Sequence, residues 1–237
     1  MKHRLKNSLD IGNKKYCDFM SHNKEDFWVN NGFEVRRNHI KIFSEIIEKE
    51  FEFEDIRLIE TGVSGNLDYG LWGFFLGAVV ESFGGEMHSV DLDCKSCENS
   101  KKIFSKNLPN LKYETYCMDS VSFLENPPII PNLLHLDSYD FQLFNPLPSA
   151  LHCWKEFKKI EALMPKGSII LVDDNWLEGT TLEWFQNGNR YERLIEFPIL
   201  GKGANIYQEV ESGNTNFNFI GDYHVPYNMI KIYIKKQ

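Results

Sequence analysis

The most informative stretch of the chain is Arg57-Leu58-Ile59-Glu60-Thr61-Gly62-Val63-Ser64-Gly65-Asn66. Its apolar start predicts a short strand that ends on an acid, and the two glycines that follow allow a tight turn. Residues 69–83 are apolar with several small side chains, which predicts a helix close against a sheet. A strand, a glycine turn and a helix in this order can receive a nucleotide-like ligand at the carboxyl end of the strand. An ordinary connection that uses glycine for steric reasons is the alternative at this point.

Composition places the chain among globular proteins with one large domain. It has 237 residues, of which 42% are hydrophobic and 25% charged. The net charge of −8 argues against a nucleic-acid partner, because phosphate contacts need clustered Lys and Arg. The basic first residues lack the apolar stretch of a signal peptide, and the apolar run 71–80 is too short to cross a bilayer. We therefore expect a cytoplasmic protein without a membrane partner.

The cysteines predict reduced thiols. There are five, an odd number, and they are scattered along the chain. Cys94 and Cys97 form a single CxxC without a second ligand pair, so a zinc site is not expected and a thiol pair at a helix start is preferred.

Expected strands and helices alternate along the chain, which predicts an α/β fold. Residues 1–25 are polar and show no clear period, so we treat them as an N-terminal arm, and residues 26–237 as the domain. Strands are expected at 87–93, 113–117, 132–137 and 168–174, with helices at 33–50, 97–107 and 148–163. This order gives a mostly parallel sheet of seven strands with helices on both faces. Residues 194–207 and 228–235 are expected as two final strands, an antiparallel pair at the sheet edge.

Carboxylates stand at the ends of the expected strands. Because parallel strands point the same way, these side chains should line one crevice. Asp91, at the end of the second strand, is placed to accept the hydroxyls of a ribose, although a solvated acid is the ordinary reading. The acid before Gly62 and the absence of a G-x-G-x-x-G pattern fit poorly around a pyrophosphate, which disfavours a dinucleotide oxidoreductase. The carboxylates concerned are Glu60, Asp91, Asp119, Asp137, Asp173 and Asp174.

Five motifs together resemble the class I S-adenosylmethionine (SAM)-dependent methyltransferases. They are Glu60-Thr61-Gly62-Val63, Ser89-Val90-Asp91, Asp119-Ser120, Leu136-Asp137-Ser138-Tyr139 and Leu171-Val172-Asp173-Asp174. Within that class the chain resembles the metal-dependent sugar O-methyltransferases of the macrocin O-methyltransferase type, with catechol O-methyltransferase more distant. The resemblance spans about residues 56–179. It implies a Rossmann-like single domain, SAM as cofactor, and Mg²⁺ or another divalent cation.

The resemblance also implies roles for single residues. Glu60, Gly62, Ser64 and Gly65 would lie beside the methionine part of SAM, Asp91 would hold the ribose, and Asp119 and Ser120 would meet the adenine. Ser64 departs from the family, which commonly has a glycine there. Asp137, Asp173 and Asp174 match the metal ligands, and carboxylate oxygens suit a hard cation. The alternative is that Asp173 and Asp174 cap a helix or face water.

The expected reaction is methylation of a hydroxyl group on a sugar or glycan with vicinal hydroxyls. Asp137 is the simplest base, and His135, Asp140 and His152 are weaker candidates, since a buried histidine is more often structural. Trp176, Tyr139 and Phe141 could wall a substrate pocket. The alternatives are a catechol-like or other small-molecule O-methyltransferase and a non-catalytic nucleoside-binding protein. Association into a homo-oligomer is left open.

Overall fold

The computed structural model describes residues 2–22, 40–63, 72–142, 145–179, 181–186, 189–196, 199–225 and 228–236. Its main sheet has eight strands, in the order β3-β2-β1-β4-β5-β10-β9, with β8 pairing with β5. The strands of this sheet are β1 (Ile56–Thr61), β2 (Gly85–Asp91), β3 (Lys112–Cys117), β4 (Leu133–Leu136), β5 (Ile169–Leu177), β8 (Ile199–Gly201), β9 (Phe217–Val225) and β10 (Asn228–Lys235).

The first five strands run parallel, and β10 is antiparallel to both β5 and β9. This confirms a mostly parallel sheet with an antiparallel pair at one edge. The expected strand over 194–207 is wrong. Only Ile199–Gly201 of its central part is a strand of the main sheet, and α7 (Ala204–Glu211) is helical with Ile206 buried. The glycine-rich turn after β8 separates the two, and the last strand pair is β9 with β10.

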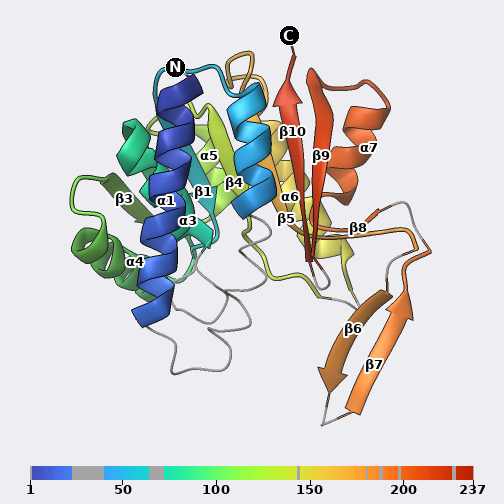
Figure 1. Ribbon diagram of the computed structural model, residues 1–237. Helices are drawn as coiled ribbons and strands as arrows, with labels where there is room; N and C mark the ends of the chain where they lie inside the picture. Colours follow the sequence, from blue (N-terminus) through green and yellow to red (C-terminus); the bar gives the residue numbers. More distant parts are fainter. Residues whose placement is uncertain are drawn as a thin grey trace.

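Helices cover both faces of the sheet (Figure 1). The helix over residues 40–50, α1 (Lys2–His22), α3 (Trp72–Phe83) and α4 (Cys94–Asn107) pack on one face, where their apolar side chains form one core with Leu58, Leu133 and Leu171. On the other face, α5 (Ser120–Glu125), α6 (Leu147–Ile160) and α7 pack over Ile59, Leu136 and Val172. The alternation of strand side chains thus supplies two separate cores.

Residues 2–22 were expected to be irregular, and this expectation is wrong, because they form helix α1. The buried residues Leu5, Leu9, Gly12, Tyr16 and Met20 recur at helical spacing and face α3. A Cβ atom on Gly12 would lie 2.5 Å from the side chain of Val79, so the two helices approach closely. Charged residues between the apolar ones hide this stripe in the sequence. The expected boundary near residue 25 lies outside the described residues.

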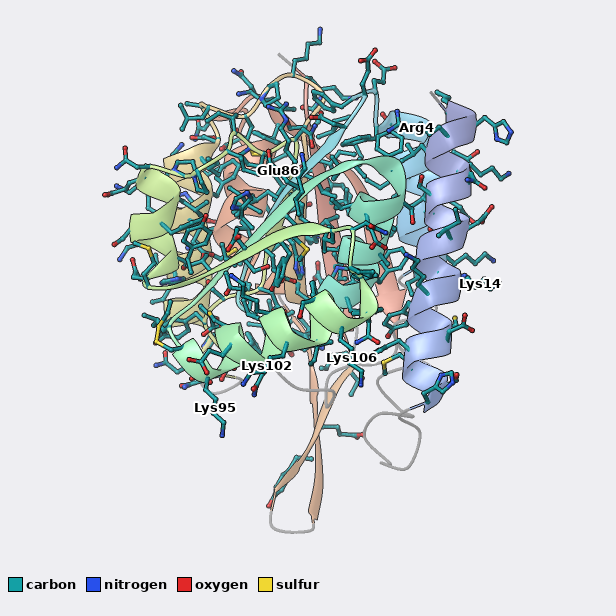
Figure 2. All side chains as sticks on the ribbon, turned by 90° about the vertical axis from the view of Figure 1, so that its left-hand side faces the viewer. Arg4, Lys14, Glu86, Lys95, Lys102 and Lys106 are labelled. Carbon is teal, nitrogen blue, oxygen red and sulfur yellow. A yellow bond between two sulfur atoms is a disulfide. The ribbon has the colours of Figure 1, made fainter. Side chains whose placement is uncertain are left out.

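Helix α4 is amphipathic and begins at a disulfide. Lys95, Lys102 and Lys106 lie on its outer surface (Figure 2), whereas Phe104 is buried. Cys94, its first residue, is bonded to Cys117 at the end of β3, with 4.9 Å between the Cα atoms. The expected reduced state is therefore wrong for this pair, while Cys17, Cys97 and Cys153 are free thiols.

Strands β6 (Thr181–Gln186) and β7 (Asn189–Leu194) form a separate antiparallel hairpin. The hairpin extends away from the main sheet, at the end of the molecule where the parallel strands finish (Figure 1). In the described part of the chain, no helix has the length and apolar character needed to cross a membrane.

Candidate active site

The carboxyl ends of β2, β1, β4 and β5 lie side by side along one edge of the sheet. This edge brings together Asp91, Gly62, Asp137 and Asp173, which are far apart in the sequence. Backbone hydrogen bonds continue the pairing beyond the strands, since the Gly62 amide donates to Val90 and the Asp137 amide donates to Thr61, both at 2.9 Å. The residues that follow these strands are therefore held side by side along one edge of the sheet.

Gly62 and Asp91 shape the turn after β1. Gly62 has a φ of 82°, and a Cβ atom there would lie 2.4 Å from the carbonyl oxygen of Asp137. Only glycine fits this conformation and this approach. The Asp91 carboxylate accepts hydrogen bonds at 2.7 Å from the amides of Val63 and Asp93. Asp91 therefore fixes the path of the turn and remains partly exposed at the edge. Ser64 and Gly65, expected next to it, lie outside the described residues.

Glu60 lies beneath this edge rather than on it. Its side chain is buried, accepts a hydrogen bond of 2.9 Å from the Ser89 hydroxyl, and lies 3.3 Å from Nδ1 of His135. A Cβ atom on Gly73 would lie 2.4 Å from the carboxylate, so α3 begins directly over it. Glu60 thus supports the turn from inside, without a solvent-facing surface for the methionine part of SAM.

His135 is also buried, at 1% exposure. Burial works to lower the pKa of His135, but the hydrogen bond to Glu60 and the charge of Asp137 outweigh it and raise the pKa above its usual value. Among the described residues, its Nε2 atom has no hydrogen-bond partner. Ligand atoms of His135, Asp137 and Asp173 lie within 4.8 Å of one another. The side chain of Asp137 is 30% exposed, so a substrate can reach Asp137 more easily than His135.

Asp119 and Ser120 begin α5 at the end of β3. Asp119 caps the helix by accepting hydrogen bonds of 2.8 Å from the amide and the hydroxyl of Ser122. Burial works to raise the pKa of Asp119, but these bonds outweigh it and lower the pKa below the ordinary value. The Ser120 hydroxyl is 2.9 Å from Nε2 of His152.

Two large apolar side chains are exposed beside these acids. Leu92 directly follows β2 with 73% exposure, and Met118 directly follows β3 with 40%. The Met118 amide donates a 2.9 Å hydrogen bond to the carbonyl of Asp91, so the two chain segments are joined here. An exposed apolar pair flanked by carboxylates is a surface on which a flat heterocycle could stack. Sequence patterns had not singled out either residue.

A second cluster of polar side chains joins the loop after β4 to helix α6. Glu156 is fully buried, and its Oε1 atom accepts a 2.6 Å hydrogen bond from Ser138 and lies 3.6 Å from Nε2 of His152. This contact with Glu156 is the main cause that raises the pKa of His152. Tyr139, with a φ of 59° and 48% exposure, lies over the His152 ring at 5.4 Å. A left-handed tyrosine is uncommon, and such backbone strain is frequent at functional sites.

Other predicted residues have simpler surroundings. Asp140 is exposed on the loop after β4. Phe141 and Trp176 pack on each other with ring centroids 4.5 Å apart and contact the small cluster of Ile195 and Leu200. These contacts near the end of β5 fit a structural packing role for both rings.

Lys202, which no sequence motif marks as a site residue, lies among the aspartates. Its ammonium is 2.7 Å from Oδ1 of Asp137 and 2.9 Å from Oδ2 of Asp174, and it is 2% exposed. Burial works to lower the pKa of Lys202, but the charges of Asp137 and Asp174 outweigh it and raise the pKa above the ordinary value. For Asp137, burial raises the pKa to about 6 even though Lys202 opposes the shift.

The side chains at this position do not fit the divalent cation that the resemblance implies. Two of the three expected ligands, Asp137 and Asp174, are already paired with one buried ammonium. In the third expected ligand, Asp173, the Oδ1 atom accepts a 2.9 Å hydrogen bond from the Asp174 amide. A metal ion on the same oxygens would lie next to a positive charge that water does not screen.

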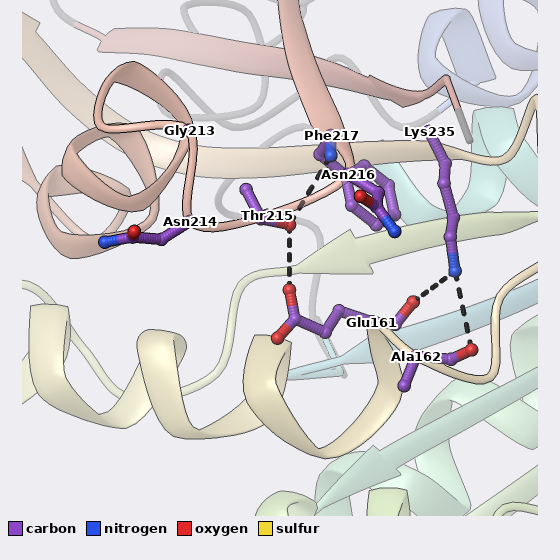
Figure 3. Close-up of a pocket in the computed structure, with 8 residues that line it drawn as sticks. All are labelled: Glu161, Ala162, Gly213, Asn214, Thr215, Asn216, Phe217 and Lys235. Carbon is purple, nitrogen blue, oxygen red and sulfur yellow. Dashed lines mark hydrogen bonds between the residues drawn. The ribbon is translucent and has the colours of Figure 1, made fainter.

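A pocket lies at the opposite edge of the sheet, between the end of α6 and the start of β9 (Figure 3). Its polar groups bind one another. Thr215 donates to Glu161, and Lys235 donates to the carbonyls of Glu161, Ala162 and Met164. This pocket is far from the strand-end acids and takes no part in the candidate site.

Comparisons with solved structures place the chain among methyltransferase folds. A SAM-dependent methyltransferase from Clostridium acetobutylicum has 12% identity and a TM-score of 0.50, with 86% of this chain and 92% of that chain covered. The magnesium protoporphyrin IX methyltransferase of Synechocystis, solved with bound SAM, has 10% identity and a TM-score of 0.52, with 90% and 86% covered. A putative rRNA methylase from Clostridium thermocellum has 13% identity and a TM-score of 0.50, with 81% and 93% covered.

The chain has the Rossmann-like methyltransferase fold. No family model and no curated protein matches the sequence. At these identities the likeness concerns the fold, and the chemistry has to be argued from the site.

Proposed function

We propose that this protein is a SAM-dependent methyltransferase that methylates a hydroxyl group of a small polyhydroxylated molecule, a sugar or the end of a glycan. The observation that carries the proposal is the carboxyl edge of the sheet. There, a surface suited to a nucleoside, formed by Asp91, Leu92 and Met118, lies along the same edge as the partly exposed Asp137.

The cofactor half of the site follows from the chemistry of these side chains. The carboxylate of Asp91 can accept hydrogen bonds from ribose hydroxyls, and Leu92 and Met118 offer apolar surface to the adenine ring. The partly exposed Asp119 can accept a hydrogen bond from the adenine amino group. When bound, SAM would supply an electrophilic methyl group on a sulfonium sulfur.

The acceptor half is built by Asp137 and Asp174, whose side chains are 30% and 28% exposed. Two neighbouring carboxylates can accept hydrogen bonds from two neighbouring hydroxyls, which favours a vicinal diol. Asp137 would take the proton of the reacting hydroxyl, and its pKa of about 6 leaves it ionised at neutral pH. His135 is too deeply buried for this role.

A transfer assay with methyl-labelled SAM tests the proposal. Monosaccharides, glycan ends, catechols and amines serve as acceptors, and Asp137→Asn is the variant expected to lose activity while still binding SAM. Labelling of a sugar hydroxyl is the expected result. Labelling of amines alone, or binding of NAD as tight as that of SAM, would contradict the proposal.

A further inference from the structure

The ammonium of Lys202 is completely satisfied by acceptors from two strand ends. It donates to Oδ1 of Asp137 at 2.7 Å and to the Asp137 carbonyl at 3.0 Å, and it lies 2.9 Å from Oδ2 of Asp174. An ammonium has three N–H groups, and these three oxygens account for all of them. Lys202 therefore has no N–H group left for a substrate, and it can act only through the two carboxylates.

The backbone around Lys202 is held against the end of β5, which places the Lys202 side chain between Asp137 and Asp174. Lys202 lies in the turn Gly201-Lys202-Gly203, where its amide donates to the Asp174 carbonyl at 3.1 Å and the Gly203 amide donates to the Asn175 side chain at 2.8 Å. A Cβ atom on Gly201 would lie 2.2 Å from the Asp174 carbonyl oxygen, and one on Gly203 would lie 2.8 Å from Oδ1 of Asn175. Both glycines are thus needed for the turn to approach β5 so closely.

Asp174 also adopts an uncommon backbone conformation, with a φ of 54°. Its side chain thereby reaches Lys202, although the following residue, Asn175, is buried in the sheet and binds the carbonyls of Val172 and Asp173. Aspartate tolerates the left-handed region better than most residues, but the conformation still has a cost. The turn and the strand end are both shaped around the same ion pair.

We propose that Lys202 is the resident cation of this site: its ammonium takes the position between Asp137 and Asp174 that the resemblance gives to a divalent ion, and it positions both carboxylates for the acceptor without a metal. The catalytic consequence rests on the proposed function. The charge arrangement itself does not, and it can be tested without turnover. Lys202 is accordingly a positioning residue.

The first experiment measures Mn²⁺ binding to the full chain by electron paramagnetic resonance and by thermal unfolding. The wild type should bind no Mn²⁺ at this site, and its unfolding midpoint should not respond to Mn²⁺. Lys202→Ala removes the ammonium from between Asp137 and Asp174 and opens space there. This variant should unfold at a lower temperature, bind Mn²⁺ at least tenfold more tightly than the wild type, and regain stability when Mn²⁺ is added.

Two matched variants separate this effect from general loss of a buried lysine. Lys202→Ala combined with Asp174→Asn should lose the gain in Mn²⁺ binding. Lys235→Ala removes another buried lysine, whose ammonium holds carbonyls at the opposite edge of the sheet (Figure 3). It should lower the unfolding temperature without any response to Mn²⁺.

Turnover provides the second readout. Wild-type methyl transfer should be unchanged by excess chelator, whereas Lys202→Ala should lose most of kcat, keep its SAM affinity, and recover part of kcat with Mn²⁺. A purely structural role for Lys202 would not give recovery by a metal. If no acceptor is methylated under any condition, the proposed function fails, while the Mn²⁺ binding results still stand.

The inference is overturned if the wild type binds Mn²⁺ and Asp173→Asn or His135→Ala removes that binding. The metal would then belong to the cluster of His135, Asp137 and Asp173. Inhibition of wild-type turnover by chelators, reversed by a divalent ion, would overturn it as well. Both of these tests use the native residue at position 202, so they decide the question even if Lys202→Ala does not fold.

Discussion

Asp91 orders the backbone of the candidate cofactor site as well as facing it. Its two carboxylate oxygens accept hydrogen bonds from the amides of Val63, after β1, and Asp93, after β2, and each oxygen can accept one more donor. Its place next to Leu92 suits it to a ribose. Loss of the Asp91 carboxylate should therefore weaken SAM binding more than it slows methyl transfer.

Asp91→Asn should weaken SAM binding by about 1–3 kcal/mol, because an amide group cannot accept from both sides as a carboxylate does. This corresponds to a loss of affinity of roughly 5- to 150-fold, which calorimetry can measure. Asp93→Asn is the control, since Asp93 is exposed and caps α4, and asparagine is an equally good cap. Equal affinity in Asp91→Asn and the wild type would remove the ribose from this residue.

The activity of Asp137 as a base should show in the pH profile. Burial raises its pKa to about 6, and a base acts in its deprotonated form, which predominates above that pKa. We expect kcat/KM to rise with pH through about 6 and to level off above it. Asp137→Asn should reduce kcat by roughly 10²- to 10⁴-fold. A flat profile from pH 5 to 8 in the wild type would exclude Asp137 as the base.

At the scale of elements, the disulfide ties the start of α4 to the end of β3, directly beside Leu92 and Met118. The two cysteines are separated by 23 residues. A cross-link of this kind restricts the unfolded chain, and it also restrains two segments that flank the proposed adenine surface.

Reduction of this disulfide should lower the free energy of unfolding by about 2–4 kcal/mol. Urea unfolding with and without a reductant measures the difference as a shift of the midpoint. The double variant Cys94→Ser with Cys117→Ser should unfold at the same midpoint in both conditions, whereas Cys17→Ser, which changes a free thiol on α1, should keep the shift. Identical midpoints for oxidised and reduced wild type would contradict the prediction.

At the scale of the whole molecule, the acids gather at one edge of the sheet, and the opposite edge has a pocket whose polar groups bind each other. Two apolar cores, one on each face, hold the sheet between them. A ligand that binds at the acidic edge contacts the ends of several strands at once, so its binding should stabilise the entire domain.

SAM at about 100 times its dissociation constant should stabilise the fold by about 2.7 kcal/mol. For a domain of this size, the thermal midpoint should rise by roughly 5–11 °C, which differential scanning fluorimetry can follow. NAD at the same concentration should give no such rise, because the sequence after β1 lacks the G-x-G-x-x-G pattern that lets the backbone approach a pyrophosphate closely. A larger shift with NAD than with SAM would point to a different cofactor.

The sequence by itself was sufficient for the local features of this protein. Short apolar runs predicted the strands, their alternation with helices predicted a parallel sheet, and the acids at the strand ends were therefore expected along one edge. These signals are local, because each depends on residues within one strand and its following turn. For the same reason, Asp91, Asp119, Asp137 and Asp173 could be placed at that edge without knowledge of the tertiary structure.

Only the tertiary structure decided what those acids contact. Lys202 reaches Asp137 across 65 residues, and the pair depends on where β8 lies beside β5, which no local pattern encodes. Glu60 shares the strand-end pattern of the other acids, yet α3 and His135 enclose it. Helix α1 is similar, since charged residues separate its apolar positions along the sequence, whereas in the fold those positions form one face that packs against α3. Charge pairing and burial are properties of the assembled layers, and they determine whether a carboxylate binds a cation, supports a turn or faces a substrate.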